Sequence, residues 1–142
     1  MTARTEAKKI ADLMISKKAF DVAILDLKKL TSATDYFVIC SADSDTQVKA
    51  IADAVQDGME ALGEHIWHQE GYHAMRWILL DYVDVVAHIF HKEERSFYNL
   101  DRLWGDAKRT EIQDPLAAGS PDTKKYSGMR KSPRKKKQAD IA

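Results

Sequence analysis

The chain has 142 residues, 44% of them hydrophobic and 31% charged, and its formal net charge is zero. This length suits one domain with a single core, and the composition excludes a chain that is disordered throughout. The one cysteine, Cys40, excludes an intramolecular disulfide and a zinc site built on cysteines. A charged N-terminus, and the lack of any uncharged stretch near the roughly 18 residues of a membrane span, predict a cytoplasmic protein.

The spacing of apolar residues predicts helices and strands along the first 104 residues. Three segments have apolar residues at helical spacing, over residues 4–18, 44–62 and 93–104. In the last of them, one stripe carries Phe97, Leu100 and Trp104. Five segments are rich in β-branched and aliphatic residues and are predicted strands, over residues 20–27, 35–42, 65–71, 74–81 and 83–90.

The order of these elements, αββαβββα, predicts an α/β (α+β) fold with a mixed sheet of about five strands flanked by helices. Because the helix over residues 44–62 forms a crossover, the strands over residues 35–42 and 65–71 should pair in parallel. The strands over residues 74–81 and 83–90 are close enough in sequence to form an antiparallel hairpin.

The zero net charge conceals a strong asymmetry. Residues 35–101 hold 13 acidic and 4 basic side chains, a balance of −9, whereas residues 111–142 hold 8 basic and 4 acidic side chains, a balance of +4. We therefore predict a folded domain over residues 1–110 and a basic, disordered tail over residues 111–142. The acidic domain would be repelled by bare phosphate and attracted to a basic protein surface.

A D-x-D sequence, Asp43 and Asp45, follows the strand over residues 35–42, as in some two-metal phosphoryl-transfer sites. The same segment can instead cap the next helix, since Ser44 and Gln47 have capping-box spacing. No glycine-rich phosphate-binding loop occurs, and histidines three apart in strands point to opposite faces. We predict no catalysis, cofactor or metal, with Cys40 as a core residue and a metal-dependent enzyme as the alternative.

The stretch RWILLDYVDVVAHIF, residues 76–90, sets two aspartates, a histidine and a tryptophan in an apolar run. With residues 82–83 as the loop, one side of the hairpin carries three facing pairs: Asp81 with Asp84, Leu79 with Val86, and Trp77 with His88. The other side is uniformly apolar and should face the core. The mixed side, with apolar anchors inside an acidic rim, suits a protein–protein interface, and a helix packed over it is the alternative.

Four stretches, DYFVICSADSDTQVKAIADAV, EG, RWILLDYVDVVAHIF and ERSFYNLDRLW, together resemble the ribosomal silencing factor family, also called RsfS or Iojap-like proteins. The resemblance covers residues 6–107. It implies a topology similar to that of nucleotidyltransferases, without their activity. It also implies binding to the large ribosomal subunit through universal ribosomal protein fourteen, which blocks joining of the small subunit and represses translation. Related organelle proteins assist large-subunit assembly, which is a further alternative.

The positions that match the family are Glu70, Gly71, Trp77, Asp81, Asp84, His88, Arg95, Tyr98, Leu103 and Trp104. The chain departs from the family at Ser41-Ala42, where Thr-Gly is frequent, and at Val83, where glycine is usual. Because valine resists a positive φ, we expect a wider hairpin turn at Val83.

Taken together, the acidic face and the resemblance predict the partner-binding residues Glu70, Trp77, Leu79, Asp81, Tyr82, Asp84, Val86, His88 and Tyr98. Trp104 and Leu103 are expected to hold the last helix to the sheet. The expected partners are the large ribosomal subunit through protein fourteen, ribosomal RNA phosphates for the basic residues 124–137, and a second copy of the chain when it is free.

Overall fold

The computed structural model describes residues 1–114, and residues 1–112 form one compact unit. The predicted disorder of the tail therefore lies, from residue 115 onward, outside the described residues. In chain order the elements are α1 (Ala3–Ser16), β1 (Phe20–Asp26), β2 (Tyr36–Ala42), α2 (Asp45–Ala61), β3 (His68–Glu70), β4 (Trp77–Asp81), β5 (Val85–His91), α3 (Lys92–Tyr98), α4 (Leu100–Leu103) and β6 (Lys108–Ile112).

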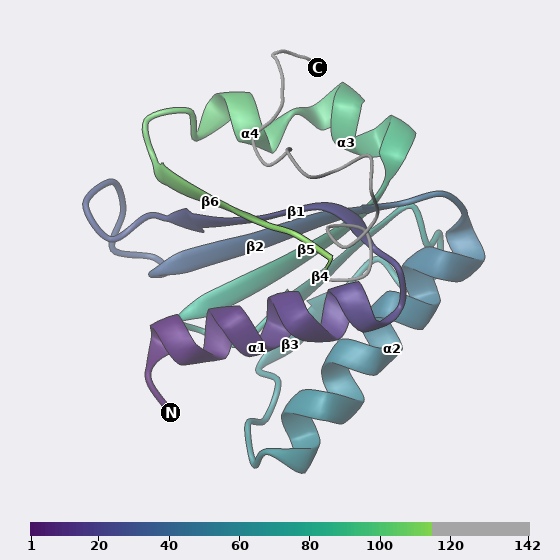
Figure 1. The fold of residues 1–142 in the computed structure, drawn as a ribbon, viewed down its shortest axis with the longest axis horizontal. Helices are drawn as coiled ribbons and strands as arrows, with labels where there is room; N and C mark the ends of the chain where they lie inside the picture. Colours follow the sequence, from purple (N-terminus) through teal and green to yellow (C-terminus); the bar gives the residue numbers. More distant parts are fainter. Residues whose placement is uncertain (115–142) are drawn as a thin grey trace. The chain divides into compact units, whose positions relative to one another are not determined.

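The predicted fold class is confirmed. A six-stranded mixed sheet has the order β3-β4-β5-β2-β1-β6, with α1 and α2 on one face and α3 and α4 on the other (Figure 1). None of the helices within residues 1–114 has the length and apolar character to cross a bilayer.

The parallel pair of the sheet differs from the predicted one. β2 pairs in parallel with β5, whereas β3 pairs in antiparallel fashion with β4. The physical reason is burial: β5 is buried along its whole length and suits a central position, while the three residues of β3 are all exposed and suit an edge. The predicted antiparallel pairing of β4 with β5 is confirmed.

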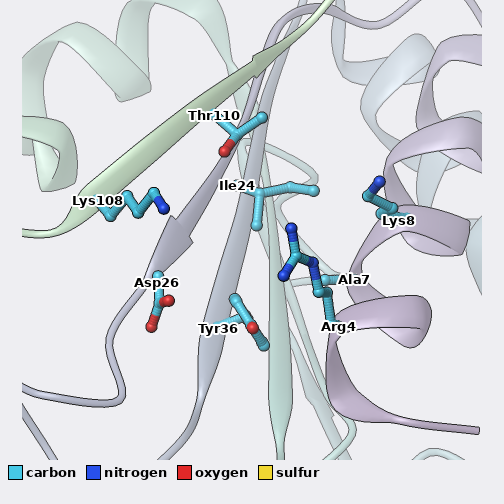
Figure 2. Close-up of a pocket in the computed structure, with 8 residues that line it drawn as sticks. All are labelled: Arg4, Ala7, Lys8, Ile24, Asp26, Tyr36, Lys108 and Thr110. Atoms are coloured by element: carbon cyan, nitrogen blue, oxygen red, sulfur yellow. The ribbon is translucent and has the colours of Figure 1, made fainter.

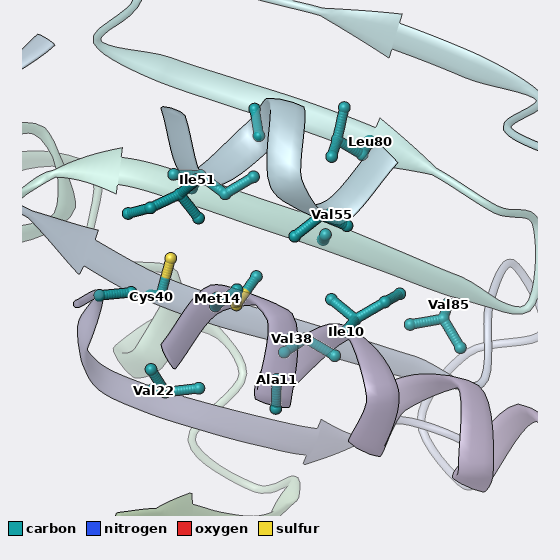
Figure 3. Close-up of a cluster of buried hydrophobic side chains, with 14 of the residues drawn as sticks. Ile10, Ala11, Met14, Val22, Val38, Cys40, Ile51, Val55, Leu80 and Val85 are labelled. Carbon is teal, nitrogen blue, oxygen red and sulfur yellow. The ribbon is translucent and has the colours of Figure 1, made fainter. Parts of the chain in front are cut away.

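The main core lies between the sheet and the helices α1 and α2 (Figure 3). Ile10 and Met14 of α1 and Val55 of α2 are fully buried against the sheet. Cys40 of β2 is also fully buried, as predicted, and this burial raises the pKa of its thiol to about 12. The thiol therefore stays protonated and inert at neutral pH.

The predicted cap of α2 is confirmed. Ser44 is the N-cap residue, and its hydroxyl accepts a hydrogen bond from the backbone N–H of Gln47 at 3.1 Å. The Gln47 side chain reaches back and accepts from the backbone N–H of Asp43 at 2.7 Å. The capping interpretation of this segment therefore has direct hydrogen-bond support.

The end of the domain differs from the prediction in two ways. First, β6 pairs with β1, with Thr110 opposite Ile24, so the predicted boundary after residue 110 falls inside a strand. Second, the predicted helix over residues 93–104 is broken at Asn99, which has a left-handed backbone (φ 48°, ψ 56°) and separates α3 from α4.

This break changes which side chains of the segment are buried. Leu100 and Trp104 pack on a second cluster of buried residues, and the Trp104 ring meets Phe37 edge to face at 5.8 Å. The predicted role of Trp104 in holding this segment to the sheet is therefore confirmed. Leu103 is 72% exposed and does not share that role, and Phe97, predicted to lie on the same stripe, is 80% exposed.

Candidate functional site

The β4–β5 hairpin has a register two residues away from the predicted one. Trp77 is opposite Phe90, Leu79 is opposite His88, and Asp81 is opposite Val86. A shift of two residues preserves the alternation of side chains. Trp77, Leu79 and Asp81 therefore still share one face of the sheet, the face that carries α3 and α4.

The hairpin turn is tight, which corrects the predicted wider turn. The Asp84 N–H donates to the Tyr82 carbonyl at 3.0 Å, forming a γ-turn with Val83 at its centre and a φ of 77° there. The Asp81 carboxylate accepts from the Val83 N–H at 2.8 Å, and the Tyr82 N–H donates to Val85. This turn leaves the Asp84 side chain exposed at the end of the hairpin.

Trp77 is the centre of an aromatic cluster on this face. It stacks on the buried Phe90 at 4.8 Å between ring centroids, and its ring centroid is 4.9 Å from that of Tyr98 of α3. Gly71 allows the chain to pass close by, because a Cβ there would lie 2.0 Å from the Trp77 carbonyl oxygen, and its φ is +94°. Half-buried Trp77 is thus held by ring contacts with Phe90 and Tyr98 and by the close approach of Gly71 to its backbone.

His88 fixes the orientation of the Trp77 indole. The indole N–H donates to His88 Nδ1 at 3.2 Å, so the proton of the neutral imidazole belongs on Nε2, which has no hydrogen-bond partner among the described residues. Burial lowers the pKa of His88 to about 3, and the ring is therefore neutral at physiological pH. The His88 ring is 4% exposed, and its centroid is 4.4 Å from that of Phe37. This buried, neutral ring positions Trp77 through the hydrogen bond to the indole.

Three of the predicted partner-binding residues are covered by the chain itself. Val86 is 8% exposed, next to His88 on the same face, and Tyr82 is 7% exposed within the main core on the opposite face. Val86, His88 and Tyr82 therefore expose little side-chain surface to a partner in this structure. Val86 and His88 are covered on the face that carries α3 and α4, whereas Tyr82 is covered in the main core.

The remaining predicted residues lie beside one another in a partly exposed area. They are joined there by Phe97, which the sequence placed on a helical stripe with Leu100 and Trp104. Glu70 is opposite Leu79, Leu79 lies between Trp77 and Asp81, and Tyr98 joins Trp77 to Phe97, whose ring is 5.0 Å away. We call this area the docking surface; it consists of Glu70, Trp77, Leu79, Asp81, Phe97 and Tyr98. Asp84 lies beyond Asp81 at the tip of the hairpin.

Phe97 was missed because its spacing with Leu100 and Trp104 is that of a buried helical stripe. The signal that could have placed it is Asn99, since asparagine is among the few residues that readily adopt a left-handed backbone and end a helix. A second exposed aromatic residue, Trp67, is 70% exposed just before β3 and also lay outside the predicted set.

Arg95 holds α3 and α4 in place against the sheet. Its guanidinium donates to both carboxylate oxygens of Asp101, at 3.0 and 3.2 Å, to the Ser41 hydroxyl at 3.1 Å and to the Asp21 carbonyl. Asp101 also accepts from Arg109 of β6 at 2.6 Å. Burial alone would raise the pKa of Asp101, but the two guanidinium groups outweigh it and hold the pKa below its ordinary value.

The two carboxylates of the alternative metal site form ion pairs with two different basic residues. Asp43 pairs with Lys92 at 3.1 Å, and Asp45 pairs with Arg76 at 3.1 Å. Within residues 1–114, no group of three or more histidine, cysteine, aspartate or glutamate side chains is arranged to hold a metal ion. The D-x-D segment thus acts in helix capping and surface ion pairs.

Comparison with known proteins gives consistent matches along the chain. The family model described as "Ribosomal silencing factor during starvation" matches residues 1–140. The ribosomal silencing factor RsfS of Bacillus subtilis is 45% identical over 96 residues, covering 68% of this chain and 81% of that protein. The chloroplastic protein Iojap of Zea mays is 35% identical over 98 residues, covering 67% of this chain and 41% of that protein.

Solved structures agree with the sequence matches. A crystal structure of a Chromobacterium violaceum protein superimposes with a TM-score of 0.73 and 31% identity, covering 81% of this chain and 97% of that chain. A Bacillus halodurans structure has a TM-score of 0.68 and 37% identity, covering 77% of this chain and 99% of that chain. The chain therefore belongs to the ribosomal silencing factor family.

Proposed function

We propose that this protein binds the large ribosomal subunit through universal ribosomal protein fourteen and thereby blocks joining of the small subunit. The observation that carries the proposal is the docking surface, where exposed Phe97 and Tyr98 adjoin the half-buried Trp77. Aromatic side chains of this kind provide most of the affinity in protein interfaces, and their burial by a partner excludes water.

The charges around the aromatic residues favour a basic partner. Glu70 and Asp81 lie on the sheet beside Leu79, and Asp84 is exposed at the hairpin tip. Rim carboxylates of this kind steer association and fix orientation more than they add affinity. A basic protein surface, as ribosomal proteins usually present, would complement the acidic rim while burying the apolar centre.

The test is cosedimentation of the full chain with isolated large subunits. Phe97→Ala and Tyr98→Ala should each weaken binding by roughly thirtyfold or more, which corresponds to about 2 kcal/mol for the loss of an interface anchor. Leu62→Ala is the matched control, because Leu62 lies at the end of α2, on the opposite side of the sheet, and is 47% exposed against 49% for Tyr98.

The same variants then test the partner and the consequence. Purified ribosomal protein fourteen should bind wild type and Leu62→Ala, but bind Phe97→Ala weakly. Subunit joining, measured on sucrose gradients, should recover with Phe97→Ala in proportion to its loss of binding. If Phe97→Ala and Tyr98→Ala bind large subunits as tightly as Leu62→Ala does, the docking surface is not the interface. If they bind subunits weakly and protein fourteen normally, another subunit component is the partner.

A further inference from the structure

A pocket of about 130 Å³ lies on the other side of the molecule from the docking surface, between α1 and the strands β1, β2 and β6. Figure 2 shows α1 residues on one side of it and strand residues on the other. Its apolar floor is formed by Ala7 and by Ile24, which is 7% exposed. Neither the docking surface nor the ion pairs of α3 and α4 involve this pocket.

Three cations from two elements line the pocket. Arg4 and Lys8 are one turn apart on α1, and Lys108 comes from β6. Among the described residues, none of these three side chains has a hydrogen-bond or ion-pair partner within the structure. Like charges one helical turn apart destabilise a helix, so the arrangement carries a cost that an external anion would relieve.

The pocket's single carboxylate does not cancel this charge. Asp26 is engaged by Lys28, through its backbone N–H at 3.0 Å and through its ammonium group at 3.6 Å. The same ammonium donates to the Tyr36 hydroxyl at 2.7 Å. Because that hydroxyl already accepts from Lys28, its own proton is directed elsewhere and is available to an acceptor in the pocket.

We propose that this pocket binds a phosphate group, with Arg4, Lys8 and Lys108 supplying charge and Tyr36 and Thr110 supplying hydroxyl donors. A guanidinium and two ammonium groups match the multiple oxygens and the charge of a phosphate better than a single carboxylate. The volume, well below the roughly 300–1,000 Å³ of sites that enclose a whole small molecule, fits one phosphate group whose remaining substituents lie outside. Both the terminal phosphate of a nucleotide and the backbone phosphate of RNA provide this chemistry.

The test uses the isolated full chain and reads out the pocket itself. Amide chemical shifts are followed during titration with inorganic phosphate, adenosine monophosphate, and a short oligouridylate without a terminal phosphate, each at constant ionic strength. Acetate serves as the control anion. We expect saturable shifts at residues 4–8 and 108–110 with at least one phosphate ligand, and none there with acetate.

The double variant Arg4→Gln with Lys108→Gln should weaken this binding by roughly tenfold or more, because charge-assisted hydrogen bonds are removed. Lys9→Gln removes one positive charge from α1 at an exposed residue outside the pocket, as Lys8→Gln does within it, and should alter binding less than about twofold. Far-UV circular dichroism and thermal unfolding without ligand verify that each variant is folded. Lys8→Gln is the second pocket variant if the double variant unfolds.

Each outcome decides the proposal. Shifts with phosphate and adenosine monophosphate alone support it with a phosphate monoester as the ligand, and shifts with oligouridylate support it with RNA as the source. Absence of shifts with all three ligands, equal shifts with acetate, or equal affinity in the pocket variants and Lys9→Gln overturns it. Because no ribosome is present, this result is independent of the proposed function, and Phe97→Ala should bind phosphate like wild type.

Discussion

At the scale of single residues, Val83 is the least favourable backbone position of the hairpin. Its φ of 77° lies in a region that costs a β-branched residue about 1–3 kcal/mol. The turn is nevertheless held, because the Asp84 carbonyl accepts from the backbone N–H groups of both Asp35 and Tyr36, at 2.9 and 3.1 Å. Contacts at the start of β2 therefore impose the conformation that the valine itself disfavours.

Val83→Gly should stabilise the protein by about 0.5–1 kcal/mol. The relief of strain exceeds the extra conformational entropy that glycine gives the unfolded chain, and little packing is removed because Val83 is 54% exposed. Urea unfolding measures the effect. Val83→Ala, which keeps a Cβ, should gain less. A glycine variant that unfolds at the same or lower urea concentration than wild type would show that the turn is not strained.

Alternation along the strands was the part of the hairpin that could be predicted from residues alone. Trp77, Leu79 and Asp81 share a face in the predicted and the observed register, because the error was an even number of residues. The turn could not be predicted, since its shape depends on hydrogen bonds from β2, which is distant in sequence. Burial of His88 likewise depends on Phe37 and Trp77, which reach it from neighbouring strands.

At the scale of elements, the prediction was accurate where a segment's own pattern decides its structure. Both long helices and the apolar strands have such patterns, and all were found. β6 was missed because Lys108–Ile112 is an exposed, mostly charged edge strand, and only pairing with β1 makes it a strand. α3 and α4 were merged because the apolar spacing across Asn99 is helical while the backbone there is not.

Arg95 is the residue on which the placement of α3 and α4 most depends. Arg95→Lys should lower the free energy of unfolding by about 2 kcal/mol, because one ammonium cannot replace the paired contacts to Asp101 together with those to Ser41 and Asp21. The value falls below the roughly 3–5 kcal/mol of a fully buried pair because Asp101 is 23% exposed. Chemical denaturation measures the change.

The same variant should loosen the docking surface before it unfolds the domain. Relative to wild type, we expect amide hydrogen exchange to accelerate more over residues 92–104 than over β2 and β5. Binding to large subunits should weaken, because Phe97 and Tyr98 no longer have a fixed position. Arg102→Ala is the control, since Arg102 is an exposed arginine of α4 and should change stability by less than about 0.5 kcal/mol. An equal increase in exchange rate over all elements of Arg95→Lys, relative to wild type, would exclude a local role for Arg95.

At the scale of the whole molecule, the aromatic cluster and the cationic pocket lie on opposite faces of the sheet. The docking surface lies on the face with α3 and α4, and the cationic pocket lies between α1 and the strands. The acidic balance of −9 over residues 35–101 follows directly from the amino-acid composition. The sequence could not predict the pocket, because Lys108 comes near Arg4 and Lys8 only when α1 packs on the sheet and β6 pairs with β1.

The basic segment from residue 115 onward leads to the last prediction. Residues 115–142 hold eight Lys and Arg and two Asp and Glu side chains, and we expect them to bind ribosomal RNA phosphates. Removing residues 115–142 should flatten the salt dependence of binding to large subunits, by roughly 0.7–0.9 in the log–log slope for each phosphate that the shortened chain no longer neutralises. The truncation begins after residue 114 because a cut at residue 110 would remove Glu111 and Ile112 from β6.

Two variants separate the contribution of this segment from that of the docking surface. Cosedimentation over a series of potassium chloride concentrations should give Phe97→Ala a lower affinity at every salt concentration with an unchanged slope, because an uncharged anchor releases no counterions. The truncated chain should show the opposite behaviour. Its slope should be flatter, and its affinity should differ less from that of wild type at high salt than at low salt. An unchanged slope in the truncated chain would place all binding to the ribosome within residues 1–114.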